Sequence, residues 1–149
     1  MGLIEQLKEK VYIGQYNTLT FYKSGIPIVT VKMVESRDVF IITNNMKDLN
    51  AHKISFDGNV HEFANKVFNV LIEDEVSKEG VESITFNDGL FIHGRIERDK
   101  VIVIIPDIYV NDEGEDVDKD IEHIFYNSNA LSELTIAEIV SVFVHQYYL

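Results

Sequence analysis

The sequence predicts an α+β fold: one acidic domain, residues 1–149, with a mainly antiparallel, meandering sheet of six to seven strands, an N-terminal helix, a central helix and two C-terminal helices. Three observations support this prediction. Residues 81–110 contain three successive strand-like segments, other β-rich segments are also separated by short connections, and amphipathic helical patterns surround them. The 46% hydrophobic content is enough for one core, and no repeat or linker marks a second domain.

The first part of the chain predicts a short helix followed by strands. The helix is predicted from apolar residues at helical spacing and a following glycine: Leu3, Ile4, Leu7, Val11 and Gly14. Two β-rich segments, residues 17–22 and 26–33, flank Lys23-Ser24-Gly25, which is short enough for a hairpin turn. Residues 39–43 predict a third strand, and residues 52–56 predict a weaker fourth.

A central helix is predicted next. Asn59 followed by Glu62 has the form of an N-cap with a capping-box partner. The helix should end between Ile72 and Ser77, because the acidic residues 73–75 would oppose the helix dipole in a last turn. Its buried face would comprise Val60, Phe63, Ala64, Val67 and Leu71.

The three strands of residues 81–110 are the best marked. Asn87-Asp88-Gly89 is typical of a two-residue hairpin turn, since Asp-Gly accommodates positive φ. It leads into a strand over residues 90–98. Residues 101–105 are uniformly apolar, as expected of an inner strand buried on both faces. Pro106 has no N–H group, so we expect this strand to end near it.

Two helices are predicted after the strands. A short one is suggested by the spacing of Ile121, Ile124 and Phe125. The last helix is predicted to start at a capping box formed by Thr135 and Glu138. Its buried stripe would comprise Ile136, Ile139, Val140, Phe143 and Tyr147.

The net charge of −12 is concentrated in the last third of the chain. Residues 101–149 hold 10 acidic side chains and 1 basic one, a net charge of −9, against −3 for residues 1–100. Such a surface repels phosphate backbones and anionic membranes and attracts basic proteins. We therefore expect a basic protein surface as the partner, and no direct binding of nucleic acid or membrane.

Composition also bounds the compartment and the chemistry. Cysteine is absent, which excludes disulfides and thiolate metal sites. No apolar run approaches the roughly 18 residues of a membrane span, and the N-terminus alternates apolar with charged residues, unlike a signal peptide. The expectation is a soluble, cytoplasmic protein without a cofactor.

The acidic run of residues 107–122 is the predicted partner-binding site. The carboxylates assigned to it are Asp112, Glu113, Glu115, Asp116, Asp118 and Asp120. A calcium loop aligned on Gly114 would place Tyr109 where the first Asp ligand belongs, so we predict no metal site. Mutual repulsion in such a run costs stability that a basic partner would offset.

A second candidate site is a polar pocket formed by His93, Arg95 and Glu97. These side chains alternate onto one face of a strand, where they form either a pocket or an ordinary solvent-facing surface. No nucleophile elbow, glycine-rich phosphate loop or paired-histidine motif is present, which makes an enzyme the less favoured class.

The first functional hypothesis is a non-enzymatic binding protein, such as an inhibitor, an immunity protein or a phage anti-defence protein that imitates a nucleic-acid backbone. The alternative is a small chaperone or assembly factor that forms a homodimer. In size, acidity and element order the chain resembles the acidic chaperones of type III secretion, without a shared motif. The third hypothesis is an enzyme or small-ligand protein that uses the strand face of His93.

Overall fold

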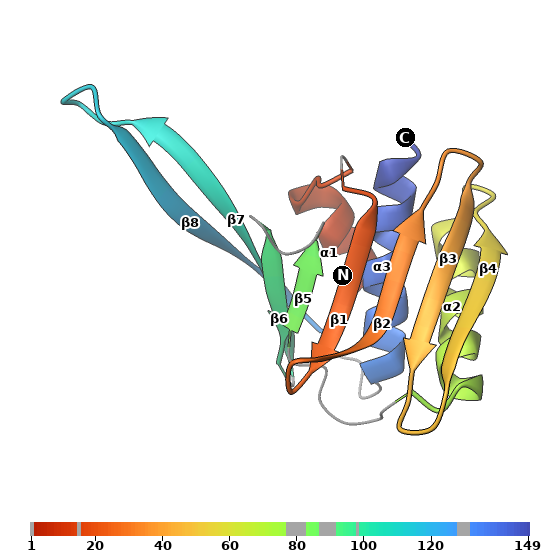
Figure 1. The fold of residues 1–149 in the computed structure, drawn as a ribbon. Coiled ribbons are helices and arrows are strands. Elements are labelled where there is room, and N and C mark those ends of the chain that lie inside the picture. The colour runs from red at the N-terminus through yellow and green to blue at the C-terminus, as the bar shows by residue number, and fades with distance from the viewer. Residues whose placement is uncertain (1, 15, 77–82, 87–91, 98, 128–131) are drawn as a thin grey trace.

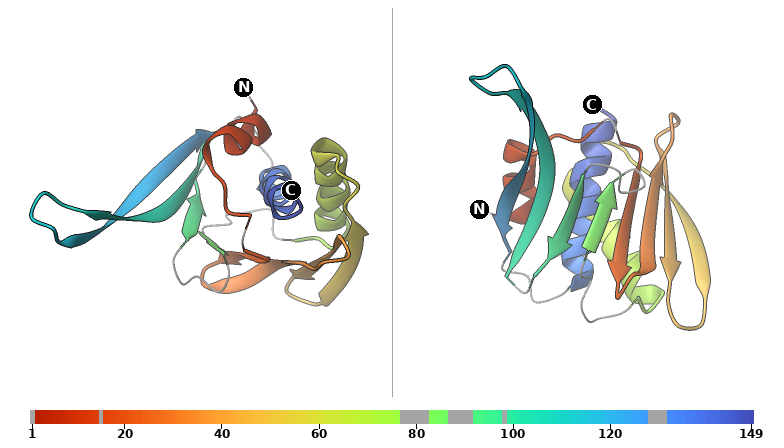
Figure 2. Two further views of the ribbon diagram at one scale, coloured as in Figure 1. Left: turned by 90° about the horizontal axis from the view of Figure 1, so that it is seen from above. Right: turned by 60° about the vertical axis from the view of Figure 1, so that its left-hand side comes forward.

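The structure, a computed structural model, describes residues 2–14, 16–76, 83–86, 92–97, 99–127 and 132–149. These residues form three helices on one face of a single open antiparallel sheet of eight strands (Figures 1 and 2). The α+β class and the antiparallel sheet are confirmed. The predicted numbers, six to seven strands and four helices, are wrong.

The elements follow one another in two groups of strands separated by a helix. In chain order they are α1 (Leu3–Lys10), β1 (Thr18–Lys23), β2 (Ile26–Met33), β3 (Asp38–Asn44), β4 (Leu49–Ser55), α2 (Val60–Glu73), β5 (Ser83–Phe86), β6 (His93–Ile96), β7 (Lys100–Val110), β8 (Asp116–Tyr126) and α3 (Ser132–Tyr147). The order across the sheet is β4-β3-β2-β1-β5-β6-β7-β8. The antiparallel pairing of β1 with β5 therefore joins the two groups.

Alternation along the strands separates a covered face from an open one. In β3, Val39 and Ile41 are buried beneath the helices, whereas the neighbouring residues Phe40 and Ile42 are only partly buried. All three helices lie on the same side of the sheet, which leaves the other side uncovered by helices (Figure 2). The hydrophobic core consequently lies between the helices and one face of the sheet.

Helix α3 occupies the centre of the core, between α1 and α2 (Figure 2). The predicted stripe of residues 136, 139, 140 and 143 is buried, but so are Ala137, Val142 and Val144, because helices and sheet surround α3 on several sides. The predicted capping box is wrong: α3 begins at Ser132, which places Thr135 inside the helix. The buried Thr135 hydroxyl instead accepts a hydrogen bond of 2.7 Å from Asn127 Nδ2.

The other two predicted helices are present, although the capping box predicted for the second is only half formed, since the N–H of Asn59 donates a hydrogen bond of 3.0 Å to Asp57 Oδ1 and not to Glu62. Helix α1 buries Leu3, Ile4 and Leu7. At the start of α2, the Asn59 side chain accepts a hydrogen bond of 3.0 Å from the backbone N–H of Glu62. The helix ends at Glu73, within the predicted interval, and its predicted apolar face is buried.

The predicted helix near Ile121 is wrong, because this segment is part of β8. Phe125 is buried in the core while Ile124 is 41% exposed, and this change of side between neighbours is typical of a strand. The apolar spacing there suits either structure, and the 11-residue partner β7 decides between them. β5 and β6 pair antiparallel, and the turn predicted at residues 87–89 lies outside the described residues.

Strand β7 is an inner strand, as predicted, but it does not end near Pro106. Residues 101–104 are buried on both faces. Pairing with β6 ends at Ile104, whereas pairing with β8 continues to Val110. The N–H groups of even-numbered residues in this strand point towards β6, as the hydrogen bond from Glu97 N to Lys100 O indicates. Position 106 therefore directs its nitrogen away from β8, beyond the described pairing with β6, and a proline there leaves the ladder with β8 intact.

Beyond the end of β6, strands β7 and β8 continue as a two-stranded ribbon. We call residues 105–121 the arm. The arm projects away from the helices and from the other strands (Figures 1 and 2). Within the described residues, no helix is long and apolar enough to cross a membrane.

The last residues of the chain fasten the helices to the sheet. Gln146 of α3 donates a hydrogen bond of 2.5 Å to Val11 O and accepts one of 3.0 Å from Ile13 N. The Tyr148 hydroxyl accepts a hydrogen bond from Val34 N and donates one to Val34 O. Gln146 and Tyr148 therefore attach the C-terminal end of the chain to the body of the protein.

Candidate partner-binding site

The arm carries the acidic residues that were predicted from the sequence to bind a partner. Asp112, Glu113 and Glu115 lie in the loop at its tip, and Asp116 and Asp120 lie on β8; all five are exposed. Asp118 pairs in register with Ile108 between them, and its side chain lies outside the described set. The structure thus gathers these residues on the one part of the sheet that projects from the body (Figure 1).

The shape of the tip depends on two residues without charge. Asn111 Oδ1 accepts hydrogen bonds from the N–H groups of Glu113, at 3.0 Å, and Glu115, at 2.9 Å. Gly114 adopts φ +80°, a conformation that side chains disfavour. The hydrogen bonds of Asn111 and the conformation of Gly114 form the turn. None of the hydrogen bonds described in this turn uses an acidic side chain.

The carboxylates on β8 are arranged in a row. Asp116, Asp120 and Glu122 are all even-numbered and so share one face of the strand, which is the open face of the sheet because the odd-numbered Phe125 is buried in the core. Positions two residues apart on a strand are about 6.8 Å apart. These three carboxylates therefore form a row of negative charge on one face of β8, and the acidic residues of the tip follow it.

The second candidate site is a surface ion-pair network at the base of the arm. Arg95 Nε lies 3.1 Å from Glu97 Oε1, and Arg95 Nη1 lies 3.6 Å from Glu122 Oε1. Lys100 Nζ is 3.7 Å from Glu97 Oε2. The Arg95 and Glu97 side chains are each 41% exposed, and His93 is exposed on β6. Exposed pairs of this kind are worth about 0–1 kcal/mol each.

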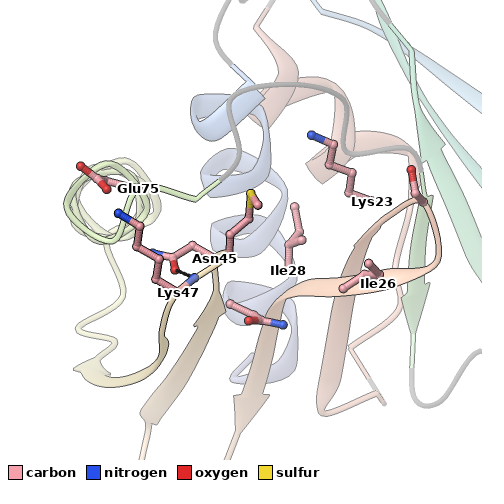
Figure 3. Close-up of a pocket in the computed structure, with 9 residues that line it drawn as sticks. Lys23, Ile26, Ile28, Asn45, Lys47 and Glu75 are labelled. Carbon is pink, nitrogen blue, oxygen red and sulfur yellow. Dashed lines mark hydrogen bonds between the residues drawn. The ribbon is translucent and has the colours of Figure 1, made fainter.

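A hollow of about 540 Å³ lies elsewhere, between the β1–β2 turn, the β3–β4 turn and the end of α2 (Figure 3). Its lining residues include apolar and charged side chains: Lys23, Ser24, Ile26, Ile28, Asn44, Asn45, Met46, Lys47 and Glu75. The volume would suit a small ligand. Charges of both signs border it, however, and they define no ligand class.

Beside this hollow lies a polar cluster that the sequence did not reveal. Asp74 Oδ2 accepts a hydrogen bond of 2.5 Å from the buried Thr43 hydroxyl and lies 2.5 Å from His52 Nε2. Asn45 Nδ2 donates a hydrogen bond of 2.7 Å to Asp74 O. The three partners of Asp74 come from β3, β4 and their connecting turn, so the cluster fastens this hairpin to α2. The only sign of this cluster in the sequence is the run of acidic residues at the end of α2, because a carboxylate that opposes the helix dipole needs a compensating partner.

Two shifted pKa values belong to the helical side of the body. Burial lowers the pKa of His145, and the nearby charge of Lys8 lowers it further. Burial also raises the pKa of Tyr148, whose ring stacks on Phe56 at 6.1 Å. Both residues belong to the packing around the end of α3, away from the acidic arm (Figure 1).

Within the described parts of the chain, no three His, Asp or Glu side chains converge as ligands for a metal ion. Comparison with protein families, with characterised proteins and with solved structures finds no match. The site must therefore be interpreted from its own geometry.

Proposed function

We propose that the protein is a non-enzymatic binding protein that docks its acidic arm on a basic surface of a partner protein. The observation that supports this proposal best is the position of the charge. The carboxylates are placed on a ribbon that projects from the folded body, and the turn at its end is built by other residues.

The energetics of the arm agree with such a role. An isolated two-stranded ribbon is marginally stable in water, and repulsion among neighbouring carboxylates weakens it further. At the far end of the arm, burial of Val110 offsets little of either effect, since this residue is 65% exposed. A partner that brings lysines and arginines would reduce the repulsion and bury part of the ribbon.

The row on β8 favours a partner whose basic surface normally binds nucleic acid. Where alternate positions are acidic, the row carries a charge about every 6.8 Å, which is half the linear charge density of one strand of B-DNA at about 3.4 Å per charge. The tip adds further carboxylates in line with the row. An inhibitor, an immunity protein or an anti-defence protein that imitates a nucleic-acid backbone is the form of binding protein that we propose.

Two variants with equal net charge test this proposal. Each raises the net charge from −12 to −8, and each replaces only exposed carboxylates. The arm variant carries Asp112→Asn, Glu113→Gln, Glu115→Gln and Asp116→Asn. The body variant carries Glu9→Gln, Glu35→Gln, Asp48→Asn and Glu73→Gln.

The measurement is capture of partner proteins from a host lysate, followed by titration of the captured partner at low and high salt. The arm variant should bind at least about tenfold more weakly than the parent, and the parent's affinity should fall as salt rises. The body variant should bind like the parent. Equal binding by the two variants would show that net charge, and not the arm, attracts the partner.

A competition assay tests the nucleic-acid-mimic form of the proposal. A double-stranded oligonucleotide should displace the protein from its partner if both occupy the same basic surface. Retention of the complex at saturating oligonucleotide would leave an acidic binding protein that is not a mimic.

A further inference from the structure

Strand β8 forms one edge of the sheet, and most of that edge is unpaired. It is hydrogen-bonded to β7 on one side, and none of the described strands lies on the other. Exposed sheet edges are templates for pairing with another chain. The edge runs from the body along the arm, so it is part of the same surface as the acidic row.

At one residue, the protein itself completes this edge. Gln6 of α1 donates a hydrogen bond of 2.8 Å from Nε2 to Tyr126 O and accepts one of 3.0 Å at Oε1 from Tyr126 N. The side-chain amide thereby makes the pair of bonds that a residue of a ninth strand would make. This contact also shows which way the backbone points: the N–H and C=O groups of Tyr126 face outward.

The backbone N–H and C=O groups of Ile124, Glu122 and Asp120 also face outward, because the direction of these groups alternates along a strand. Within the described part of the chain, these outward groups make no hydrogen bond. The side chains beside them are accessible: Ile124 is 41% exposed and Glu122 is 50% exposed. Nothing described in the fold therefore covers the edge between Asp116 and Ile124.

The two faces of β8 next to this edge differ in chemistry. On the open face stand the carboxylates of Asp116, Asp120 and Glu122. On the other face stand Val117, which is partly buried, and Ile121, which is 38% exposed. A strand added at the edge would place its own alternate residues opposite these two rows.

We propose that β8 captures an extended segment of the partner by β-augmentation, and that this segment alternates basic with apolar residues. Its lysines or arginines would lie opposite the acidic row, and its apolar residues would lie beside Val117 and Ile121. This inference rests on the proposed function, since it specifies how the acidic arm holds its basic partner.

Charge decides against a second copy of this chain as the occupant. Two β8 edges paired with each other would bring two rows of carboxylates together, on molecules that each carry −12. A basic strand instead pairs opposite charges along the edge.

The test distinguishes the contribution of the outward N–H to binding from that of the carboxylate at the same residue, Glu122. Glu122→Pro removes both, whereas Glu122→Thr removes the carboxylate alone. Proline is tolerated where the N–H of an edge strand faces solvent, so both variants should keep the parental fold. Asp120→Pro and Asp120→Thr form a second pair of the same design, in case Glu122→Pro unfolds the protein.

The probe is an octapeptide of alternating Lys and Val, labelled for fluorescence anisotropy. A second peptide carries N-methyl groups on alternate residues, on the side that would face β8, and keeps every side chain. Both are titrated against the parent, the two Glu122 variants and the arm variant, with sedimentation velocity as a check on the oligomeric state.

We expect Glu122→Pro to weaken peptide binding by about tenfold, and Glu122→Thr by only about two- to threefold. N-methylation should weaken binding to the parent at least as much as Glu122→Pro does. Equal loss in both Glu122 variants, together with equal binding of both peptides, would overturn β-augmentation. The proposed function would survive that result if the arm variant still lost its lysate partner.

Two other outcomes would also overturn the inference. In one, the parent does not bind the alternating peptide at all. In the other, the parent is a dimer that Glu122→Pro converts to a monomer, because a second copy would then be the occupant of the edge.

Discussion

The two outermost hairpins of the sheet have similar local structure but opposite surroundings. The β3–β4 hairpin is fastened to α2 through Asp74, which bonds Thr43 and His52 with its carboxylate and Asn45 with its carbonyl. The β7–β8 hairpin shares its base with the sheet and then leaves the body as the arm (Figure 1). One hairpin thus uses its polar groups internally, whereas the other displays them.

This difference shows how a sheet can combine a hairpin that is anchored to a helix with one that projects from the body. The carboxylate of Asp74 is 9% exposed and has partners within the fold, so it serves stability. The arm carboxylates are exposed, and their turn does not need them. Acidic residues therefore have different surroundings at the two ends of the sheet: Asp74 is hydrogen-bonded within the fold, and the arm carboxylates are exposed.

The largest expected effect contrasts two valines of the same strand. Val103 is fully buried in the body, and Val110 is 65% exposed on the arm. Val103→Asn should lower the free energy of unfolding by about 3–5 kcal/mol, since it removes apolar burial and buries an amide. Val110→Asn should change it by less than about 0.5 kcal/mol. Urea titration followed by circular dichroism gives both values.

Equal losses in the two valine variants would mean that the far part of the arm is packed against the body. That result would contradict the comparison and the proposed function together.

An intermediate effect is expected at the fastened hairpin. Asp74→Ala leaves the buried Thr43 hydroxyl without this acceptor and should lower the free energy of unfolding by about 1–3 kcal/mol. Hydrogen exchange should increase in β3 and β4 and stay unchanged in β7 and β8. Glu73→Ala is the control, because its carboxylate is exposed on the preceding residue. An exchange profile identical to that of the parent would show that Asp74 does not hold this hairpin.

The smallest expected effect concerns His145. Its pKa in the folded protein lies below the ordinary value of 6.5, because burial disfavours the charged ring. The unfolded chain therefore binds the proton more readily, and the stability of the fold decreases as the pH falls below about 6.5. His145→Gln should show a smaller loss of thermal stability between pH 7 and pH 5 than the parent. The same pH dependence in both would assign the loss to carboxylates alone.

Much of the fold could be predicted from local patterns. The N-cap at Asn59, the apolar stripe of α3 and the buried segment 101–105 are properties of neighbouring residues. The N-cap was confirmed, and the stripe and the segment are buried except at their last residues, Tyr147 and Ile105, which are partly buried. The errors occurred where a distant partner decides the structure. Residues 121–125 fit a helix until the register with β7 assigns them to a strand, and Pro106 is tolerated within β7 because its nitrogen faces away from β8.

The candidate site shows the same limit. Composition identified the acidic run, but its placement on a projecting ribbon depends on the 11-residue length of both β7 and β8, which was not foreseen. The cluster of Asp74, Thr43 and His52 joins three separate elements, so no local spacing could indicate it. His93, Arg95 and Glu97 were found from alternation alone, and the structure places them on an exposed face.

The central position of α3 also has a consequence for how the protein is made. The strands whose apolar face α3 helps to cover, β2 among them, precede it in the chain, and residues 56–131, which are 76 residues, separate the end of β4 from the start of α3. At a synthesis rate of about 5–20 residues per second, the ribosome needs about 4–15 seconds to traverse that interval. During this time, part of the sheet's apolar face has no α3 to cover it. We expect nascent chains stalled before residue 132 to be captured by ribosome-associated chaperones, and chains that have emerged past residue 147 to be released from them.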